Sequence, residues 1–202
     1  MKHQTRIIAA PLLLAFLMAS AIAVRGQGAG EWITVAPADE GFSILMPGKP
    51  DEQLDRVPMM GNTYKMHLFT TVDDSSGMLC MMIMQEFPAI SGVLTPAARL
   101  DKFMEGFKEG LIKSLGNSVG SKPDLQPDRD LDLKGHAGRQ YTIVLGESHG
   151  LVRTFDAGRR VYVLLVLGGD EKNSSVARFL GSLEITAAPP PVAIPVTEIK
   201  PS

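Results

Sequence analysis

The pentapeptide from Gly146 to Gly150 is the stretch that comes nearest to a catalytic motif, because it reads Gly-Glu-Ser-His-Gly. In hydrolases the pattern G-x-S-x-G places the serine on a strained turn between a strand and a helix. Here an apolar strand pattern follows Gly150, and no histidine occurs after His149 to complete the order serine, acid, histidine. We therefore interpret Ser148 as part of a hairpin turn, and a serine hydrolase is the least favoured function.

Asp128, Asp130 and Asp132 alternate at the spacing with which a calcium loop begins. Such a loop needs a glycine at its sixth position for the sharp turn and a glutamate at its twelfth as the bidentate ligand. The residues at those positions are Leu133 and Arg139. Alternation of Asp with Leu is typical of a strand with one wet face, so we predict a half-exposed strand and no metal site.

Methionine is frequent, with 11 residues, and Cys80 is the single cysteine. Thioether and thiol groups are soft ligands that suit Cu(I). In a strand, Met78, Cys80, Met82 and Met84 would share one face and Met81 would point to the other. Methionine also fills irregular cores, and a lone cysteine forms no disulfide within the chain. We expect burial and no cofactor, with a small-molecule or soft-metal (Met/Cys) carrier as the alternative function.

The other ionisable candidates are histidines and arginines. The histidines beyond the N-terminal segment are scattered and lack a metal-binding spacing, so each is expected in a turn or at the surface: His67, His136 and His149. Four arginines lie within or beside three consecutive predicted strands, where they would form a basic spot for an acidic partner. They are the candidate partner-binding residues: Arg139, Arg153, Arg159 and Arg160.

The elements that must position these residues are centred on three strands in succession, 140–145, 151–155 and 161–167. Each is rich in β-branched or aromatic residues, and a glycine-containing turn separates it from the next. The third strand is apolar on both alternating faces, which is stable only in the middle of a sheet that is covered on both sides. The sheet should therefore carry helices or further structure on each face.

Upstream of this meander, strands are predicted at 32–35 and 42–46, followed by a hairpin of 64–72 with 78–87. Thr95 and Pro96 then suit the cap and first turn of a helix, and apolar residues recur at three- and four-residue steps as far as Leu115.

A short strand at 131–134 follows a polar loop at 118–130, and a closing helix is predicted from about Glu171 to Leu183. The order ββββ-α-ββββ-α predicts an α+β fold, with a largely antiparallel sheet flanked by helices in an α/β/α sandwich. A dinucleotide-binding fold is excluded, because no glycine-rich phosphate loop follows any strand.

The two ends of the chain differ from its middle. Lys2 and Arg6, an apolar run and two overlapping A-x-A sites form an export signal. The expected organisation is a signal peptide at 1–23, a flexible lead-in at 24–30, a single domain at 31–186 and a Pro-rich disordered tail at 187–202. The protein should be exported, periplasmic or secreted, and without a membrane span after cleavage. An uncleaved N-terminal anchor is the alternative, because the apolar run just reaches spanning length.

Charge excludes one class of partner. Removal of Lys2 and Arg6 with the signal leaves 18 basic against 22 acidic residues. Nucleic-acid binding calls for a clustered positive surface, which this balance does not support.

The layout of the domain resembles the PsbP-like group of exported proteins, which includes the DcrB and LpqN-type bacterial members. The resemblance spans most of Trp32 to Ile185. The segments that carry it are the opening Trp32 to Pro47, a Gly135-x-x-Gly-Arg139 turn, a strand with Arg153, the segment Arg159 to Tyr162, and the terminal Phe179 to Ile185. It implies an antiparallel sheet flanked by helices and an accessory or binding role at a membrane surface, in the lumen or in the periplasm.

Together these features favour an exported, non-enzymatic accessory or binding domain of the bacterial envelope. Its partner would be a protein or another envelope component. No catalytic residue is expected.

The signal segment generates the first testable prediction. Export should remove the chain through about Ala23, because the two A-x-A sites directly follow the apolar run. The intact mass of the exported protein measures this. A mass that still includes residues 1–21 would identify an anchored form instead.

Overall fold

The computed structural model describes residues 31–59, 61–88, 94–115, 122–186 and 194–195. Its elements in chain order are β1 (Trp32–Val35), β2 (Phe42–Pro47), β3 (Asp51–Met59), β4 (Asn62–Asp73), β5 (Met78–Glu86), α1 (Pro96–Leu115), β6 (Asp124–Leu133), β7 (His136–Leu145), β8 (Ser148–Asp156), β9 (Arg160–Leu167), α2 (Ser174–Gly181), β10 (Glu184–Ile185) and β11 (Ile194–Pro195).

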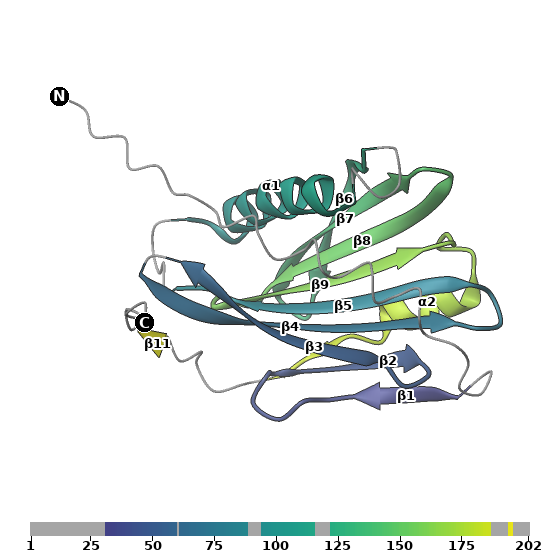
Figure 1. Ribbon diagram of the computed structural model, residues 1–202, viewed down its shortest axis with the longest axis horizontal. Helices are drawn as coiled ribbons and strands as arrows, with labels where there is room; N and C mark the ends of the chain where they lie inside the picture. The colour runs from purple at the N-terminus through teal and green to yellow at the C-terminus, as the bar shows by residue number, and fades with distance from the viewer. Residues whose placement is uncertain (1–30, 60, 89–93, 116–121, 187–193, 196–202) are drawn as a thin grey trace, which may run out of the picture.

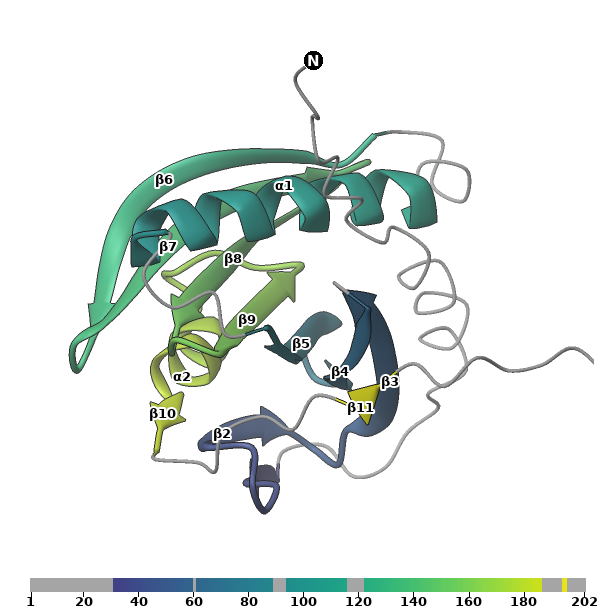
Figure 2. The same ribbon diagram turned by 90° about the vertical axis from the view of Figure 1, so that its left-hand side faces the viewer.

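The frame of the molecule is an eight-stranded sheet in the order β11-β4-β5-β9-β8-β7-β6, with β3 also paired to β4. Its pairs are antiparallel, as predicted. The sheet is strongly twisted, so β6 and β3 lie at opposite ends of a curved layer (Figure 2). A smaller sheet, β1-β2-β10, lies below it (Figure 1).

Strand β9 lies in the middle of the large sheet, and all of its residues are buried. Val161, Val163 and Leu165 belong to an apolar cluster on one face of the sheet. Leu164 and Val166 belong to a second cluster on the other face. The predicted central strand with two covered faces is therefore confirmed.

Helix α1 covers the first face and packs across β7 and β8 (Figure 1). The predicted apolar stripe faces the sheet, and its buried members are Leu100, Met104, Phe107 and Leu111. Thr95 accepts a hydrogen bond from the backbone N–H of Ala98 at 3.3 Å, which is the predicted cap. Arg99 binds Asp156 with both Nε and Nη2, at 2.8 and 2.7 Å, and ties the start of the helix to the β8–β9 turn.

The second face is covered by two kinds of structure. Helix α2 begins after Asn173, whose side chain accepts from the N–H groups of Ser175 and Val176, and it buries Val176, Phe179 and Leu180. The small sheet covers the remainder, with Phe42, Ile44 and Met46 of β2 directed into the same cluster. The expected α/β/α sandwich is thus correct in having one helix on each face but lacks this sheet, which shares the second layer with α2.

The element order also differs from the predicted one. Strand β3 was not expected, because its sequence is mostly polar and contains Pro58. It forms at the edge of the sheet, where one side of a strand needs no partner and prolines are tolerated. Strand β6 begins at Asp124, inside the expected polar loop, and it too is an edge strand. The two-residue strands β10 and β11 are too short to leave a sequence pattern.

The expected boundaries are covered only in part. Within the tail predicted at 187–202, Ile194 and Pro195 pair with β4, and the rest of the tail lies outside the described residues. The predicted signal peptide and the lead-in at 24–30 also lie outside the described residues.

The central strand generates the second prediction. Leu165→Asp should prevent folding, because Leu165 is 1% exposed and the new carboxylate would have neither water nor a partner. An unpaired buried charge costs several kcal/mol, on the order of the whole stability of a domain. Asp130→Ala is the control, since Asp130 is 80% exposed and its ion pair with Arg139 is a surface pair. Thermal melts measure both, and a wild-type melt for Leu165→Asp would contradict the central position of β9.

Candidate functional site

Ser148 lies in a hairpin, as the sequence indicated. Gly146 and Glu147 form the turn between β7 and β8, and Ser148 is paired with Leu145 at its base. The structure explains why glycine occupies both positions of the motif. Gly146 has a positive φ of 61°, and a Cβ atom at position 150 would lie 1.8 Å from the carbonyl oxygen of Val166. The motif is therefore a strand-to-strand turn and not a nucleophile elbow.

The three alternating aspartates lie on β6, so the predicted half-exposed strand is confirmed. Each carboxylate has a local partner. Asp130 accepts from Arg139 at 2.8 Å, Asp132 accepts from the N–H of Gly135 at 3.0 Å, and Asp128 accepts from the Gln140 amide at 2.7 Å. Within the described ranges, no group of three or more His, Cys, Asp or Glu side chains is arranged to hold a metal ion.

The methionine-rich strand is β5, and its side chains fill the core. Met78, Cys80, Met82 and Met84 share the second cluster, while Met81 lies in the first, as the strand geometry predicted. Burial, with the charge of Asp73 adding to it, raises the pKa of Cys80 to about 12. The group is therefore a neutral thiol at physiological pH, whereas a metal ligand must be a thiolate.

The four candidate arginines do not form one basic spot. Arg139 binds Asp130 and Asp101, Arg153 binds Glu171 at 2.8 Å, and Arg160 binds Glu86 at 3.2 Å. Arg159 is half-buried beside Arg160, and its Nε has no hydrogen-bond partner. Three of the four positive charges are thus already opposed by carboxylates of the same chain.

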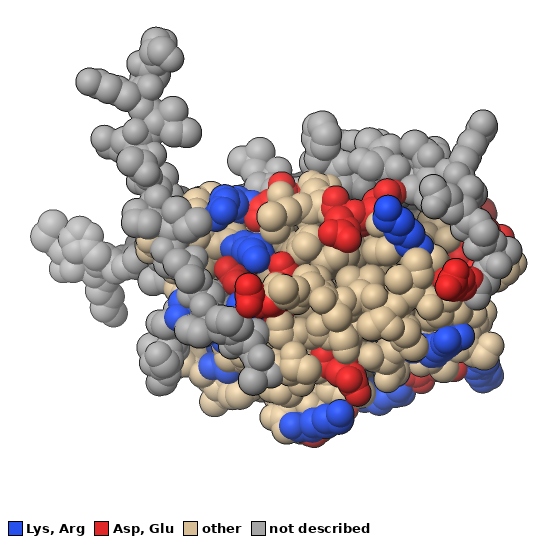
Figure 3. Space-filling view, turned by 90° about the horizontal axis from the view of Figure 1, so that it is seen from below, with Lys and Arg blue, Asp and Glu red and all other residues tan. Residues whose placement is uncertain are grey.

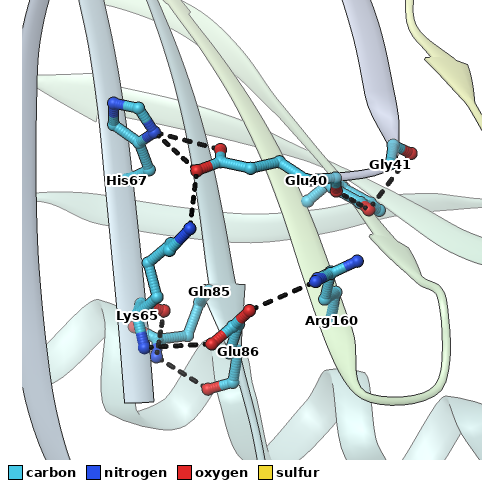
Figure 4. A network of polar contacts seen from close by, with 8 residues as sticks. Glu40, Gly41, Lys65, His67, Gln85, Glu86 and Arg160 are labelled. Carbon is cyan, nitrogen blue, oxygen red and sulfur yellow. Dashed lines mark hydrogen bonds and ion pairs between the residues drawn. The ribbon is translucent and has the colours of Figure 1, made fainter. Parts of the chain in front are cut away.

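A polar cluster that the sequence did not reveal lies around Glu40, in the loop between β1 and β2 (Figure 4). Glu40 is 3% exposed, and both of its carboxylate oxygens accept from Nδ1 of His67, at 2.9 and 3.0 Å. Nζ of Lys65 lies 3.3 Å from the same carboxylate. Lys65 and His67 both belong to β4, so the loop is held across the sheet by charged groups.

The central strand β9 also binds this loop. The hydroxyl of Tyr162 donates to the carbonyl oxygen of Glu40 at 2.7 Å and lies 3.2 Å from that of Gly41. Burial, against a lowering effect of Arg160, raises the pKa of Tyr162 to about 12, so the hydroxyl remains a donor. Burial alone would raise the pKa of Glu40, but His67 and Lys65 together outweigh it and keep this pKa below its ordinary value of 4.5.

A second buried pair continues the cluster along β5 and β9. Glu86 and Arg160 are both buried, and the Glu86 carboxylate also accepts from the backbone N–H of Lys65 at 3.3 Å. The side chain of Gln85 donates to the carbonyl oxygen of Lys65, also at 3.3 Å. Both peptide groups of Lys65 are therefore directed toward β5.

The geometry of the Glu40 cluster fits a structural role better than a catalytic one. A carboxylate that orients a histidine through Nδ1 is one half of a catalytic relay, and the other half is a nucleophile at Nε2. Nε2 of His67 instead lies 3.7 Å from Glu52, an exposed acid on β3. The cluster thus connects the β1–β2 loop, β4 and β3.

The outer edge of β3 is the exposed feature beside this cluster. The direction of its peptide groups follows from the ladder. In an antiparallel pair, residues alternate between bonding one neighbour and the other. Lys65 bonds toward β5, so its cross-strand partner Arg56 points its own N–H and C=O away from β4. By the same alternation Glu52 and Leu54 also present theirs to the open edge.

Leu54 is 58% exposed and is the one exposed large hydrophobic side chain among the described residues. It lies opposite His67 in the β3–β4 register, on the face that carries Glu52 and Arg56. On the lower face of the molecule, acidic and basic side chains lie next to one another around an uncharged centre (Figure 3). An apolar residue flanked by an acid and a base, on a strand edge that pairs with no other described strand, is therefore the candidate binding site.

No family model matches the chain, and no curated protein sequence matches it. The solution structure of cyanobacterial PsbP (CyanoP) from Synechocystis sp. PCC 6803 is similar, with 13% sequence identity and a TM-score of 0.47, over 81% of this chain and 97% of that one. This similarity carries no conclusion about the family or the function of the chain.

In the part of the chain that the structure describes, no helix is both long enough and apolar enough to cross a membrane.

The Glu40 cluster generates the third prediction. Glu40→Gln should lower the free energy of unfolding by about 1–3 kcal/mol, because it removes a buried, charge-assisted hydrogen bond between the carboxylate and His67. Glu105→Gln, on the exposed side of α1, is the matched control. Denaturant unfolding at neutral pH measures the difference.

The same pair of proteins should differ in pH dependence. The folded pKa of Glu40 lies below its unfolded value, so its stabilisation is complete above pH 4.5 and is lost as the pH falls through the folded pKa. The stability gap between wild type and Glu40→Gln should therefore narrow on acidification. A gap that stays constant down to pH 3 would contradict the ionised state of Glu40.

Proposed function

We propose that this chain is an exported, non-enzymatic accessory domain of the bacterial envelope that binds a polypeptide partner through the outer edge of β3. The observation that carries the proposal is the set of outward-directed peptide groups at Glu52, Leu54 and Arg56, with Leu54 exposed between the two charged side chains. A free strand edge of this kind binds an extended segment as an additional strand.

The energetics of strand addition fit this edge. Main-chain hydrogen bonds supply affinity, while alternate side chains select the partner. On β3, Leu54 offers an apolar contact, and Glu52 and Arg56 offer one charge of each sign on the same face. The partner segment would therefore be extended, with an apolar residue between a basic and an acidic one.

The Glu40 cluster supports the non-enzymatic part of the proposal. Its carboxylates are paired with Lys65, His67 and Arg160, and the Lys65 and His67 contacts hold β4, the strand that pairs with β3. A sheet edge binds a segment with little loss of entropy only if the edge is already rigid. The cluster supplies that rigidity next to Leu54.

The soft-metal carrier remains the rival proposal, and packing weighs against it. The sulfur atoms of Met78, Cys80, Met82 and Met84 lie in a buried cluster, so a metal ion could reach them only if the core opened.

Site-specific photo-crosslinking tests the proposed edge. A photoreactive residue in place of Arg56 should crosslink the exported protein to a polypeptide, whereas the same residue in place of Lys102 on α1 should not. Adding Leu54→Pro should abolish the Arg56 crosslink, because it removes an outward N–H that an added strand would need.

The proline variant should still fold. Leu54 makes no ladder bond to β4, and Pro58 already occupies an equivalent outward position. Its melting temperature should stay within a few degrees of that of the wild type, whereas Gln53→Pro, which removes an inward ladder bond, should lower it. A crosslink that survives Leu54→Pro, or no crosslink at all, would reject the proposed edge.

A further inference from the structure

We propose that the partner of this edge is a second copy of the chain, paired antiparallel along β3 with Leu54 at the two-fold axis. The inference rests on the proposed function and names the partner of that same edge. Two identical strands that pair antiparallel are necessarily related by a two-fold axis, so this contact would be isologous.

The segment Pro50–Pro58 has Leu54 at its centre and a proline at each end, and residues of opposite charge, Glu52 and Arg56, lie two positions to either side of the centre. Its sequence is Pro-Asp-Glu-Gln-Leu-Asp-Arg-Val-Pro. When a second copy runs the other way with Leu54 opposite Leu54, Glu52 faces Arg56 of that copy, and Arg56 faces its Glu52. The terminal prolines also face one another. The charges are thus self-complementary, whereas two identical edges would ordinarily oppose like charges.

The hydrogen bonds agree with this register. Among the described residues, the peptide groups that β3 directs away from β4 without a partner are those of Glu52, Leu54 and Arg56, and the three pairs formed about Leu54 use these residues alone. In an antiparallel ladder, each such pair exchanges both of its hydrogen bonds. The interleaved residues, Gln53 and Asp55, keep their bonds to β4. Pairing would therefore cost the existing sheet nothing.

Other registers that use the same peptide groups are worse. A shift that centres the axis on Glu52 or on Arg56 places two like charges directly opposite each other. When the axis is centred on Asp55, the two copies of Asp55 face each other. When it is centred on Gln53, Asp51 of one copy faces Asp55 of the other. Like charges directly opposite one another destabilise a ladder. Only the register about Leu54 pairs every acid on the exposed face with a base.

The side chains at this contact are accessible. Leu54 is 58% exposed and the Glu52 side chain is 59% exposed, so both can meet a second copy. Leu54 would pack against its counterpart at the axis, with an acid–base pair on either side of it. The apolar surface that the monomer leaves in water is thereby covered.

The prolines limit the contact to a closed dimer. Pro50 and Pro58 have no N–H, so the new ladder ends at the same distance on each side of Leu54. Each copy has one β3 edge, and pairing uses it up. At the far edge of the sheet, β6 is interrupted by an irregularity between Pro127 and Arg129, which discourages further strand addition.

Charge exchange tests the dimer. The protein, purified as the host cell exports it, should be dimeric by sedimentation equilibrium. Glu52→Arg and Arg56→Glu should each weaken self-association by on the order of tenfold or more, since each places like charges together on both sides of the axis. The double variant Glu52→Arg/Arg56→Glu should restore it. Asp51→Arg, a charge change of equal size on the other face of β3, should have little effect.

Mixing the two single variants, Glu52→Arg and Arg56→Glu, tests the charge pairing directly. One carries arginine at both 52 and 56 and the other carries glutamate at both, so each repels itself and attracts the other. An equimolar mixture should form a heterodimer, which also shows that both variants are folded. A wild type that is monomeric up to about 500 µM, where even a weak contact would be populated, or a dimer that ignores the exchanges, overturns the inference.

Crosslinking then separates the two proposals. A monomeric protein that still crosslinks from position 56 to a different polypeptide, in a manner blocked by Leu54→Pro, would reject the dimer and leave the proposed function standing. An absence of both dimer and crosslink would reject the two together.

Discussion

The burial of β9 on both of its faces is the constraint on which the rest of this structure depends. A strand of eight buried residues cannot exist unless each face has a layer of its own. Helix α1 supplies one layer, and α2 with the small sheet supplies the other. Tyr162 of this strand directs its hydroxyl into the second layer, where the group needs an acceptor, and it finds one in the carbonyl oxygen of Glu40 in the β1–β2 loop. The position of the loop thus follows from the chemistry of the central strand.

From that loop the same logic extends to the sheet edge. Glu40 is buried and ionised, so it requires groups that donate hydrogen bonds or carry positive charge, and the alternate residues His67 and Lys65 of β4 supply them. Their side chains share the face on which β3 places Leu54 and Arg56. The acceptor that Tyr162 needs in the core therefore places Glu40 and its partners beside β3. Among the described residues, β3 is the only strand that bears an exposed leucine.

The sequence predicts those parts of the fold whose burial leaves a periodic pattern. Val161 to Leu167, the meander around it and the stripe from Leu100 to Leu111 are core residues, so their apolar spacing is visible. Strand β3 leaves no such pattern, because an edge strand buries little of its surface. Glu40 could not be recognised either, since a carboxylate in a turn is ordinarily solvated and its partners lie more than twenty residues away. The candidate site falls on these two elements, so it emerges only from the three-dimensional arrangement.

The two strands at the ends of the large sheet, β3 and β6, differ in how their outer edges are protected, and this contrast is the reason to regard β3 as a binding edge. Strand β6 carries an irregularity beside Pro127, and its arginine and aspartate side chains are engaged with β7 and Glu171. Both devices hinder the approach of another strand. Along β3 the prolines stand just before the strand, at Pro50, and near its end, at Pro58, and the stretch between them directs alternate peptide groups outward with a leucine at the centre. Prolines at both ends of an otherwise unprotected strand edge allow a partner segment of defined length to pair with it. An edge protected along its whole length would pair with no segment.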